Sequence, residues 1–211
     1  DIALTVLSDM IFNSTLPEDE FLREKGVILN EIISSLDSPD EIAYDSYLHE
    51  MWNGHPLSRR ITGDTHHVES LRRDQLLQFY TQRYVPGNMV ISIAGNLSAE
   101  YIIDRVREIM AGREAGRFHA ARSVPRRIPG WKIVKERFNQ VHLYTGISFP
   151  SKGSLEDYYT ILVFSTLFGE SISSRLYQQI REQEGLCYTI YAFRTYYSDC
   201  VQWNVYSGTQ A

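Results

Sequence analysis

One stretch decides the fold of this chain: residues 21–33 read Phe21-Leu22-Arg23-Glu24-Lys25-Gly26-Val27-Ile28-Leu29-Asn30-Glu31-Ile32-Ile33. Its apolar residues recur at the three- and four-residue spacing of a helix that turns one face toward a core. Pro17 suits the first turn of a helix, and the acidic residues 18–20 suit the positive end of the helix dipole. The stretch therefore predicts the middle of one long helix that ends before Pro39.

Two carboxylates interrupt the apolar pattern of this predicted helix. Glu24 and Glu31 are seven residues apart, so they share one face, two turns apart. At 1.5 Å of rise per residue their Cα atoms lie ~10 Å apart. Because zinc–oxygen bonds are ~2.1 Å long, we expect at most one of the two to bind a given metal ion directly. On the helix alone, the favoured interpretation is that both are surface glutamates that face water.

Composition excludes several classes of protein. The chain has 211 residues, of which 43% are apolar, so it is long enough for one large core or two modest ones. A net charge of −5 without long basic runs argues against a nucleic-acid partner. No apolar stretch is long enough to span a bilayer, so no membrane insertion is expected. The two cysteines, Cys187 and Cys200, form no CxxC pair, which argues against a disulfide scaffold and a cysteine-rich zinc site.

The histidines do not supply a complete metal site within this sequence. His49 precedes a glutamate, but the next histidine is His55, which fails the spacing of an HExxH helix. For the remaining histidines a structural or surface role is the favoured interpretation; they are His66, His67, His119 and His142. A zinc site that used this chain would therefore need ligands from elsewhere.

The rest of the chain alternates helical and strand patterns. Further helices are predicted at residues 2–12, 40–52, 74–84, 98–110, 157–168 and from Ser173 or Ser174 to 183. Strands are predicted at 89–95, 131–138, 141–149, 188–196 and 201–206, with the first of them buried. The helix at 157–168 is apolar nearly all round and is expected to be buried. Residues 112–130, rich in glycine, proline and arginine, predict a linker. The fold class is α+β, with two related units that each pack helices on one face of a mixed or antiparallel sheet.

Short motifs along the chain carry a family resemblance. In order, they are Leu7-Ser8-Asp9-Met10, Glu24-x6-Glu31, His55-Pro56-Leu57, Ile61-Thr62-Gly63, Tyr84-Val85-Pro86-Gly87-Asn88, Ala94-Gly95-Asn96, Ser173-Ser174-Arg175-Leu176-Tyr177-Gln178-Gln179-Ile180-Arg181-Glu182 and Gly185-Leu186-Cys187-Tyr188. Together they resemble the inverzincin metallopeptidases, the pitrilysin group that includes mitochondrial processing peptidase. The signature of that group is HxxEH followed downstream by a glutamate. Each motif alone is weak, and it is their order and spacing over essentially the whole chain that carries the resemblance.

The resemblance implies roles for four residues. Glu31 corresponds to the third zinc ligand and Glu24 to the accessory glutamate. Arg181 and Tyr188 correspond to residues that contact the substrate backbone and steady the tetrahedral oxyanion. Without the resemblance, the favoured interpretation of this pair is a helix-surface arginine and a core tyrosine. The implied activity is that of a zinc endopeptidase, in which a zinc-bound water attacks a peptide or small protein held in extended form at a sheet edge.

The chain departs from the family pattern in one decisive respect, because it contains no HxxEH helix. The resemblance places that helix upstream of Asp1, together with any targeting signal. We therefore expect residues 1–111 to be the latter part of a first, zinc-site domain, 112–130 the linker, and 131–211 the first part of a second domain. Both units of the pitrilysin-like fold are expected to be incomplete, and these residues alone are expected to be inactive.

The resemblance also implies partners, and two alternative functions stay open beside it. A peptide or unfolded-protein substrate is expected, together with a second subunit of the family, with a homodimer favoured. One alternative is a non-catalytic structural or substrate-binding subunit of the same family. The other is a protein-interaction domain, which would be favoured if Glu24 and Glu31 faced water and the two units packed without a cleft.

Overall fold

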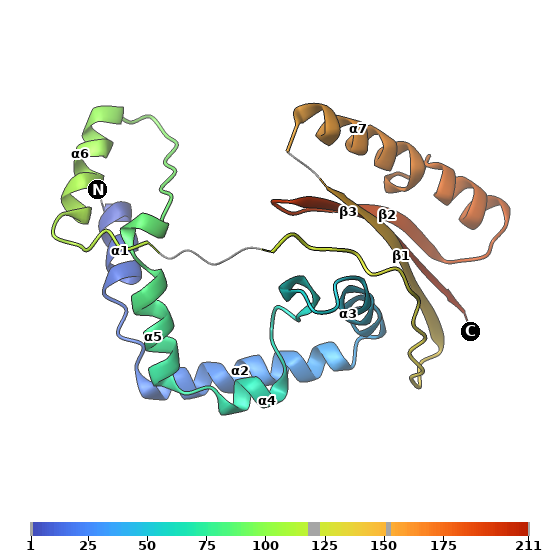
Figure 1. Ribbon diagram of the computed structural model, residues 1–211, viewed down its shortest axis with the longest axis horizontal. Coiled ribbons are helices and arrows are strands. Elements are labelled where there is room, and N and C mark those ends of the chain that lie inside the picture. The colour runs from blue at the N-terminus through green and yellow to red at the C-terminus, as the bar shows by residue number, and fades with distance from the viewer. Residues whose placement is uncertain (1, 118–122, 151–152, 211) are drawn as a thin grey trace. The chain divides into compact units, whose positions relative to one another are not determined.

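The computed structural model describes residues 2–117, 123–150 and 153–210 (Figure 1). They form helices and one antiparallel sheet, which confirms the α+β class. By their contacts the residues divide into two compact units: unit 1 holds Asp1–Leu29 with Thr65–Ala121, and unit 2 holds Asn30–Asp64 with Arg122–Ala211. Within the described ranges, no helix is long and apolar enough to cross a membrane. The domain boundaries expected from the sequence, at residues 111 and 131, stay a prediction.

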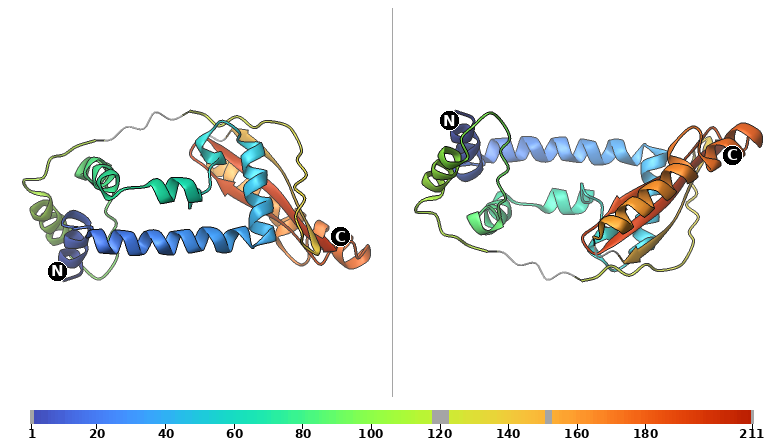
Figure 2. Two further views of the ribbon diagram at one scale, coloured as in Figure 1. Left: turned by 90° about the horizontal axis from the view of Figure 1, so that it is seen from below. Right: turned by 90° about the horizontal axis from the view of Figure 1, so that it is seen from above.

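The regular elements of unit 1 are all helices among its described residues (Figure 2). Its elements are α1 (Ile2–Phe12), the first part of α2 (Glu18–Leu36), α4 (Thr65–Ser70), α5 (Arg73–Arg83), a 3₁₀ turn (Pro86–Asn88) and α6 (Ala99–Met110). The Lys25 ammonium donates to the carbonyls of Glu69 at 2.6 Å and Leu71 at 3.0 Å, at the end of α4. A cation is favourable at that end of a helix, where carbonyls lack partners. The Lys25 contact thereby ties α2 to the α4–α5 turn.

The strand predicted at residues 89–95 is wrong. The segment has no strand pairing, and Val90 is 96% exposed rather than buried. A strand needs a neighbour that accepts its N–H groups and donates to its carbonyls. Unit 1 offers no strand among its described residues, so the β-branched side chains of this segment have no sheet to join.

Unit 2 contains a three-stranded antiparallel sheet. Its strands are β1 (Gln140–Pro150), β2 (Thr189–Tyr196) and β3 (Cys200–Gln210), in the order β1-β3-β2. The strands predicted at 141–149, 188–196 and 201–206 are confirmed, and β3 runs four residues further than expected. The strand predicted at 131–138 is wrong: a groove of about 770 Å³, also lined by α3 (Pro39–Met51), lies between this segment and β1. The segment consequently lacks the backbone pairing that would make it a strand.

α3 and α7 (Leu155–Ser165) lie against opposite faces of this sheet. Successive residues of β3 point to opposite faces. Asn204 accepts a hydrogen bond from the Tyr47 hydroxyl of α3 at 2.6 Å, whereas Trp203 donates to Ser165 of α7 at 3.0 Å. Burial raises the pKa of Tyr47 to about 12, so its hydroxyl stays protonated and can donate. Because Asn204 is fully buried, this hydrogen bond satisfies a polar group that would otherwise be costly to bury.

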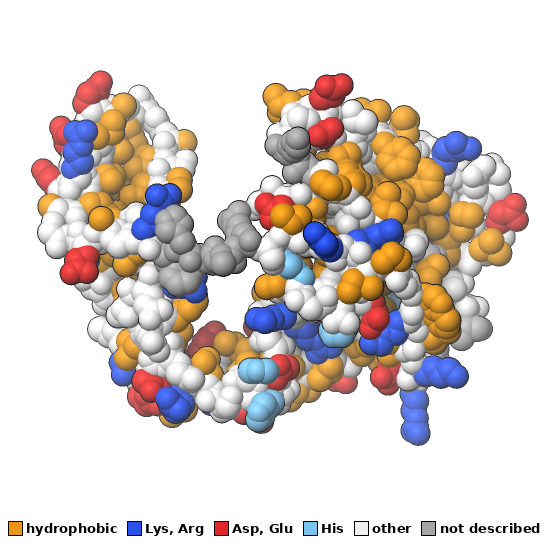
Figure 3. Space-filling model, in the orientation of Figure 1, with side chains coloured by type: hydrophobic (Ala, Val, Ile, Leu, Met, Phe, Trp, Pro, Cys, Tyr) orange, Lys and Arg blue, Asp and Glu red, His pale blue; other side chains and the backbone are white. Residues whose placement is uncertain are grey.

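The helix predicted at 157–168 is α7 followed directly by a π-helical turn, η3 (Thr166–Glu170). Ser154 caps its start by accepting from the backbone N–H of Asp157 at 3.0 Å. Its expected burial on all sides is wrong, since Val163 and Leu167 are more than half exposed. In the described part of unit 2 only one side of α7 packs on the sheet, and hydrophobic side chains gather over this region on the visible surface (Figure 3).

Candidate functional site

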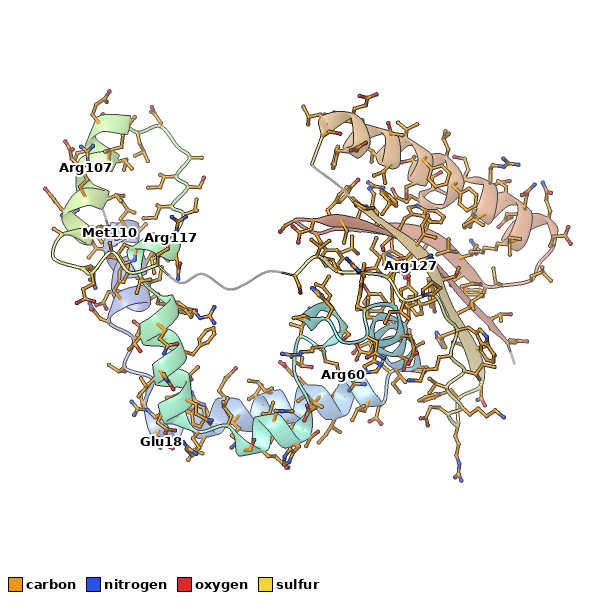
Figure 4. All side chains as sticks on the ribbon, in the orientation of Figure 1. Glu18, Arg60, Arg107, Met110, Arg117 and Arg127 are labelled. Carbon is orange, nitrogen blue, oxygen red and sulfur yellow. The ribbon has the colours of Figure 1, made fainter. Side chains whose placement is uncertain are left out.

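Glu24 and Glu31 lie on one continuous helix, as their spacing predicts. α2 begins at Glu18 with three acidic residues in its first turn and ends at Leu36, before Pro39 (Figure 4). Both candidate carboxylates are exposed, while Ile32, beside Glu31, is almost fully buried. Neither carboxylate has a hydrogen-bond or ion-pair partner in the part of the chain that the structure describes. They are therefore available to groups outside this chain.

The described residues do not hold zinc by themselves. They contain no group of three or more histidine, cysteine, aspartate or glutamate side chains that could bind a metal ion. Zinc in proteins takes at least three such ligands, and Glu31 supplies one carboxylate. The His55 ring is engaged with the Ser123 carbonyl at 3.0 Å, and the His142 ring with the Tyr206 hydroxyl at 2.9 Å. His119 lies outside the described residues.

Arg181 and Tyr188 are brought together by the structure. Arg181 lies on a π-helical segment, η4 (Tyr177–Gln183), and Tyr188 directly precedes β2. The Arg181 guanidinium lies over the Tyr188 ring, 5.7 Å from its centroid, and over the Tyr177 ring at 4.5 Å. Both distances are in the range of a cation–π attraction. The Tyr188 backbone N–H donates to the Gly208 carbonyl of β3 at 3.1 Å, so the sheet fixes the start of this strand.

This pair is accessible to a ligand. Tyr188 is 82% exposed, so it is a surface residue and not the core tyrosine that the sequence alone favours. The Arg181 side chain is 31% exposed, and its Nη1 lies 4.0 Å from a carboxylate oxygen of Glu182. A guanidinium has five N–H donors, so others remain to bind a carbonyl or carboxylate oxygen. Within unit 2, no hydrogen bond, ion pair or cation–π contact joins this pair to Glu31 in the described residues. The candidate residues thus fall into two separate groups.

Sequence reasoning missed Tyr177. It lies four residues before Arg181, the spacing at which helical side chains meet, so the signal was present in the sequence. Its ring is the nearer of the two that flank the guanidinium. The structure therefore adds Tyr177 to the group formed by Arg181 and Tyr188.

Relatives with similar sequences are named as proteases. The chain is 33% identical, over 99% of its length, to the uncharacterised zinc protease YmxG of Bacillus subtilis, and spans 51% of that protein. The chain thus covers about half the length of the curated relatives that it matches. What those whole proteins do is not thereby shown for this chain.

Solved structures share the fold. A peptidase M16 inactive domain from Pseudomonas fluorescens matches with a TM-score of 0.87 at 21% identity, over 99% of this chain and 51% of that one. The ferredoxin protease FusC, solved as a mutant in complex with Arabidopsis ferredoxin, matches with a TM-score of 0.67 at 17% identity, over 99% of this chain and 24% of that one. At these identities the likeness concerns the fold alone.

The family comparison agrees with the motifs of the sequence. Residues 70–211 match the family described as the peptidase M16 inactive domain. The match covers most of the chain and includes the segment that carries Tyr177, Arg181 and Tyr188. The expected membership of a zinc metallopeptidase family is confirmed. This chain belongs to the peptidase M16 family, through its inactive domain.

Proposed function

We propose that this chain is part of a zinc-dependent endopeptidase and that Arg181 and Tyr188 bind the peptide substrate. The observation that carries the proposal is the stack of the Arg181 guanidinium between the Tyr177 and Tyr188 rings. Such a stack holds a long, flexible side chain in one place at little further entropic cost when a ligand binds. Hydrogen bonds from its edge to main-chain carbonyls would recognise an extended peptide whatever its side chains.

Glu31 is proposed as one ligand of the zinc ion, and Glu24 as an accessory group near it. The support for this proposal is that both carboxylates are exposed on a single helix. Neither has a partner among the described residues, so both are available to a metal ion. The remaining zinc ligands would come from outside these 211 residues, because the described residues do not complete a site. Residues 1–111 and 131–211 are proposed to be parts of two domains, with 112–130 as their linker.

The proposed partners are an extended peptide or unfolded protein and a second subunit of the same family, preferably a second copy of this protein. FusC, a ferredoxin protease solved with ferredoxin bound, supports a protein substrate for this fold. The separation of Glu31 from Arg181 into groups without mutual contact among the described residues of unit 2 is compatible with sites completed by other chain segments.

A non-catalytic subunit is the second candidate function, and one observation favours it. The family that matches residues 70–211 is described as an inactive domain. In this case the same arginine and tyrosines would hold a peptide without cleaving it. Both candidate functions predict peptide binding, but only the endopeptidase predicts cleavage. One experiment that measures binding and cleavage therefore distinguishes them.

The experiment uses the intact protein, a fluorescent unstructured peptide and added zinc. We expect zinc-dependent cleavage, and for Arg181→Ala a loss of peptide affinity of about tenfold or more, as for a truncated charged hydrogen-bond donor. Arg175→Ala is the matched control, because Arg175 is exposed on the same helical segment and lies outside the ring stack. Binding without cleavage at saturating zinc would establish the non-catalytic subunit, and equal affinities of the Arg181→Ala and Arg175→Ala variants would exclude the proposed binding role.

A further inference from the structure

A partly buried ion pair joins η3 to β2, the strand that Tyr188 directly precedes. Glu170, at the end of η3, pairs with Arg194 of β2, and their side chains are only 23% and 16% exposed. The Ser165 hydroxyl donates to the same carboxylate at 2.6 Å and accepts from Trp203 at 3.0 Å. The Glu170 carboxylate therefore joins α7 to β2, and the Ser165 hydroxyl extends this link to β3. Removing one partner of such a pair leaves the other charge uncompensated in a poorly solvated place.

The Glu170 end of η3 is pressed against β2. A Cβ atom added to Gly169 would lie 2.6 Å from the Ala192 Cβ and 2.8 Å from the Ala192 backbone nitrogen, so the approach requires a glycine. Ala192 and Arg194 are two residues apart on β2, so their side chains lie on the same face of the sheet, which is also the face of Tyr188. The π-helical segments and this face of β2 therefore form one contact layer, and α7 continues along the same side of the sheet (Figure 1).

A short, tied loop connects Glu170 to the segment that carries Arg181. Residues 171–174 form this loop. The Gln178 side chain donates to the Ile172 carbonyl at 2.8 Å, and the Ser174 hydroxyl accepts from the Tyr177 backbone N–H at 3.4 Å. Because the loop is short and hydrogen-bonded to η4, we expect a displacement of Glu170 to displace η4 as well. The contact layer runs from Glu170 on η3 to Arg181 on η4, where the Arg181 guanidinium contacts the Tyr188 ring.

We propose that Glu170 is a positioning residue, which through its ion pair with Arg194 fixes η4 on β2 and so keeps Arg181 stacked against Tyr188. The inference rests on the proposed function only in so far as the Arg181–Tyr188 pair binds peptide. An ordinary stabilising ion pair would affect the unfolding of unit 2 and leave the Arg181 stack unchanged in the folded protein. A spectroscopic signal from the Arg181 side chain in the folded protein therefore distinguishes the two roles.

The test is the side-chain N–H signal of Arg181 in the NMR spectrum of the intact protein. Ring currents from Tyr177 and Tyr188 displace this signal from that of an unstacked arginine, for which exposed Arg175 is the internal reference. In Glu170→Gln we expect the Arg181 signal to move at least halfway toward the Arg175 position. We expect peptide affinity to fall about fivefold, as for residues that act through a neighbour. Glu184→Gln is the matched control, since it makes the same change at an exposed glutamate beyond η4 and is expected to alter neither.

Arg194→Lys covers the case in which Glu170→Gln does not fold. It keeps a cation beside Glu170 but loses the planar fork, so a smaller displacement of the Arg181 signal is expected. An unmoved Arg181 signal in a folded Glu170→Gln variant, or in Arg194→Lys if only that variant folds, overturns the inference. A moved signal with unchanged peptide affinity supports the positioning and contradicts the proposed binding role of Arg181. Weakened affinity with an unmoved signal contradicts the positioning alone.

Discussion

The two groups of candidate residues differ in how much of their setting this chain supplies. The Arg181 guanidinium lies over the Tyr177 and Tyr188 rings, and Tyr188 is tied to β3 by a main-chain hydrogen bond. Glu24 and Glu31 have only the helix beneath them, and their carboxylates have no partner in the described residues. The difference teaches that the proposed peptide-binding group is pre-formed in this chain, whereas the proposed metal site would have to be completed by other residues.

The largest expected effect on stability comes from opening a cavity in the core of unit 2, the unit that contains the first group. Trp52 is fully buried beside Met51 and Cys200, and its ring meets that of Tyr197 edge-on. We expect Trp52→Ala to lower the free energy of unfolding by about 3–5 kcal/mol, because it removes an aromatic side chain from a core. Urea denaturation followed by circular dichroism measures this change.

The matched control for that substitution is Trp131→Ala. Trp131 is 84% exposed, so the same chemical change should alter the free energy of unfolding by less than about 0.5 kcal/mol. Equal effects of the two substitutions would contradict the placement of Trp52 in a core between α3 and the sheet.

A smaller effect on the free energy of unfolding is expected at Asp40, which, unlike Glu24 and Glu31, has a hydrogen-bond partner. The Ser38 hydroxyl donates to Asp40 at 2.6 Å, and this hydrogen bond lowers the pKa of Asp40 from 3.8. A lowered folded-state pKa gives stability that is present above pH 3.8 and is lost as the pH falls through the folded value. Ser38→Ala should thus destabilise the protein at about pH 6 and converge on the wild type as the pH falls below the lowered pKa of Asp40. Parallel curves at all pH values would contradict this linkage.

The smallest effect on stability is expected for the second group. Glu24→Gln and Glu31→Gln should each change the free energy of unfolding by less than about 0.5 kcal/mol, because neither carboxylate has a partner to lose among the described residues. In the intact protein with zinc, Glu31→Gln should lower the zinc content strongly and Glu24→Gln only weakly, as measured by metal analysis. Equal zinc retention by both variants would contradict the assignment of Glu31 as the ligand.

The helices were predictable from sequence where local spacing and capping residues are enough to specify them. The spacing around Glu24 and Glu31 predicts α2, and Ser98 predicts the start of α6, where its hydroxyl accepts from the Tyr101 N–H at 3.3 Å. The segments 89–95 and 131–138 were predicted wrongly because their residues favour strands but do not reveal whether a pairing neighbour exists. The exposure of α7 was missed for a similar reason, since burial of its second side depends on other elements.

The candidate site was predictable only in part. Periodicity places Glu24 and Glu31 on one face, but the link between Arg181 and Tyr188 crosses from helix to strand and follows from the family resemblance, not from spacing. The ion pair between Glu170 and Arg194 joins residues 24 positions apart in different elements, which no local pattern reveals. The contacts that order the site are therefore tertiary.

The central place of β3 has a consequence for hydrogen exchange. β3 pairs with β1 on one side and β2 on the other, so its backbone N–H groups are bonded along both edges. Local opening of either outer strand leaves half of these bonds intact. Because neighbouring amides of β3 donate to opposite strands, amides around Trp203 should exchange with solvent deuterium at one common rate only if unit 2 opens as a whole, and at two rates if β1 or β2 opens by itself.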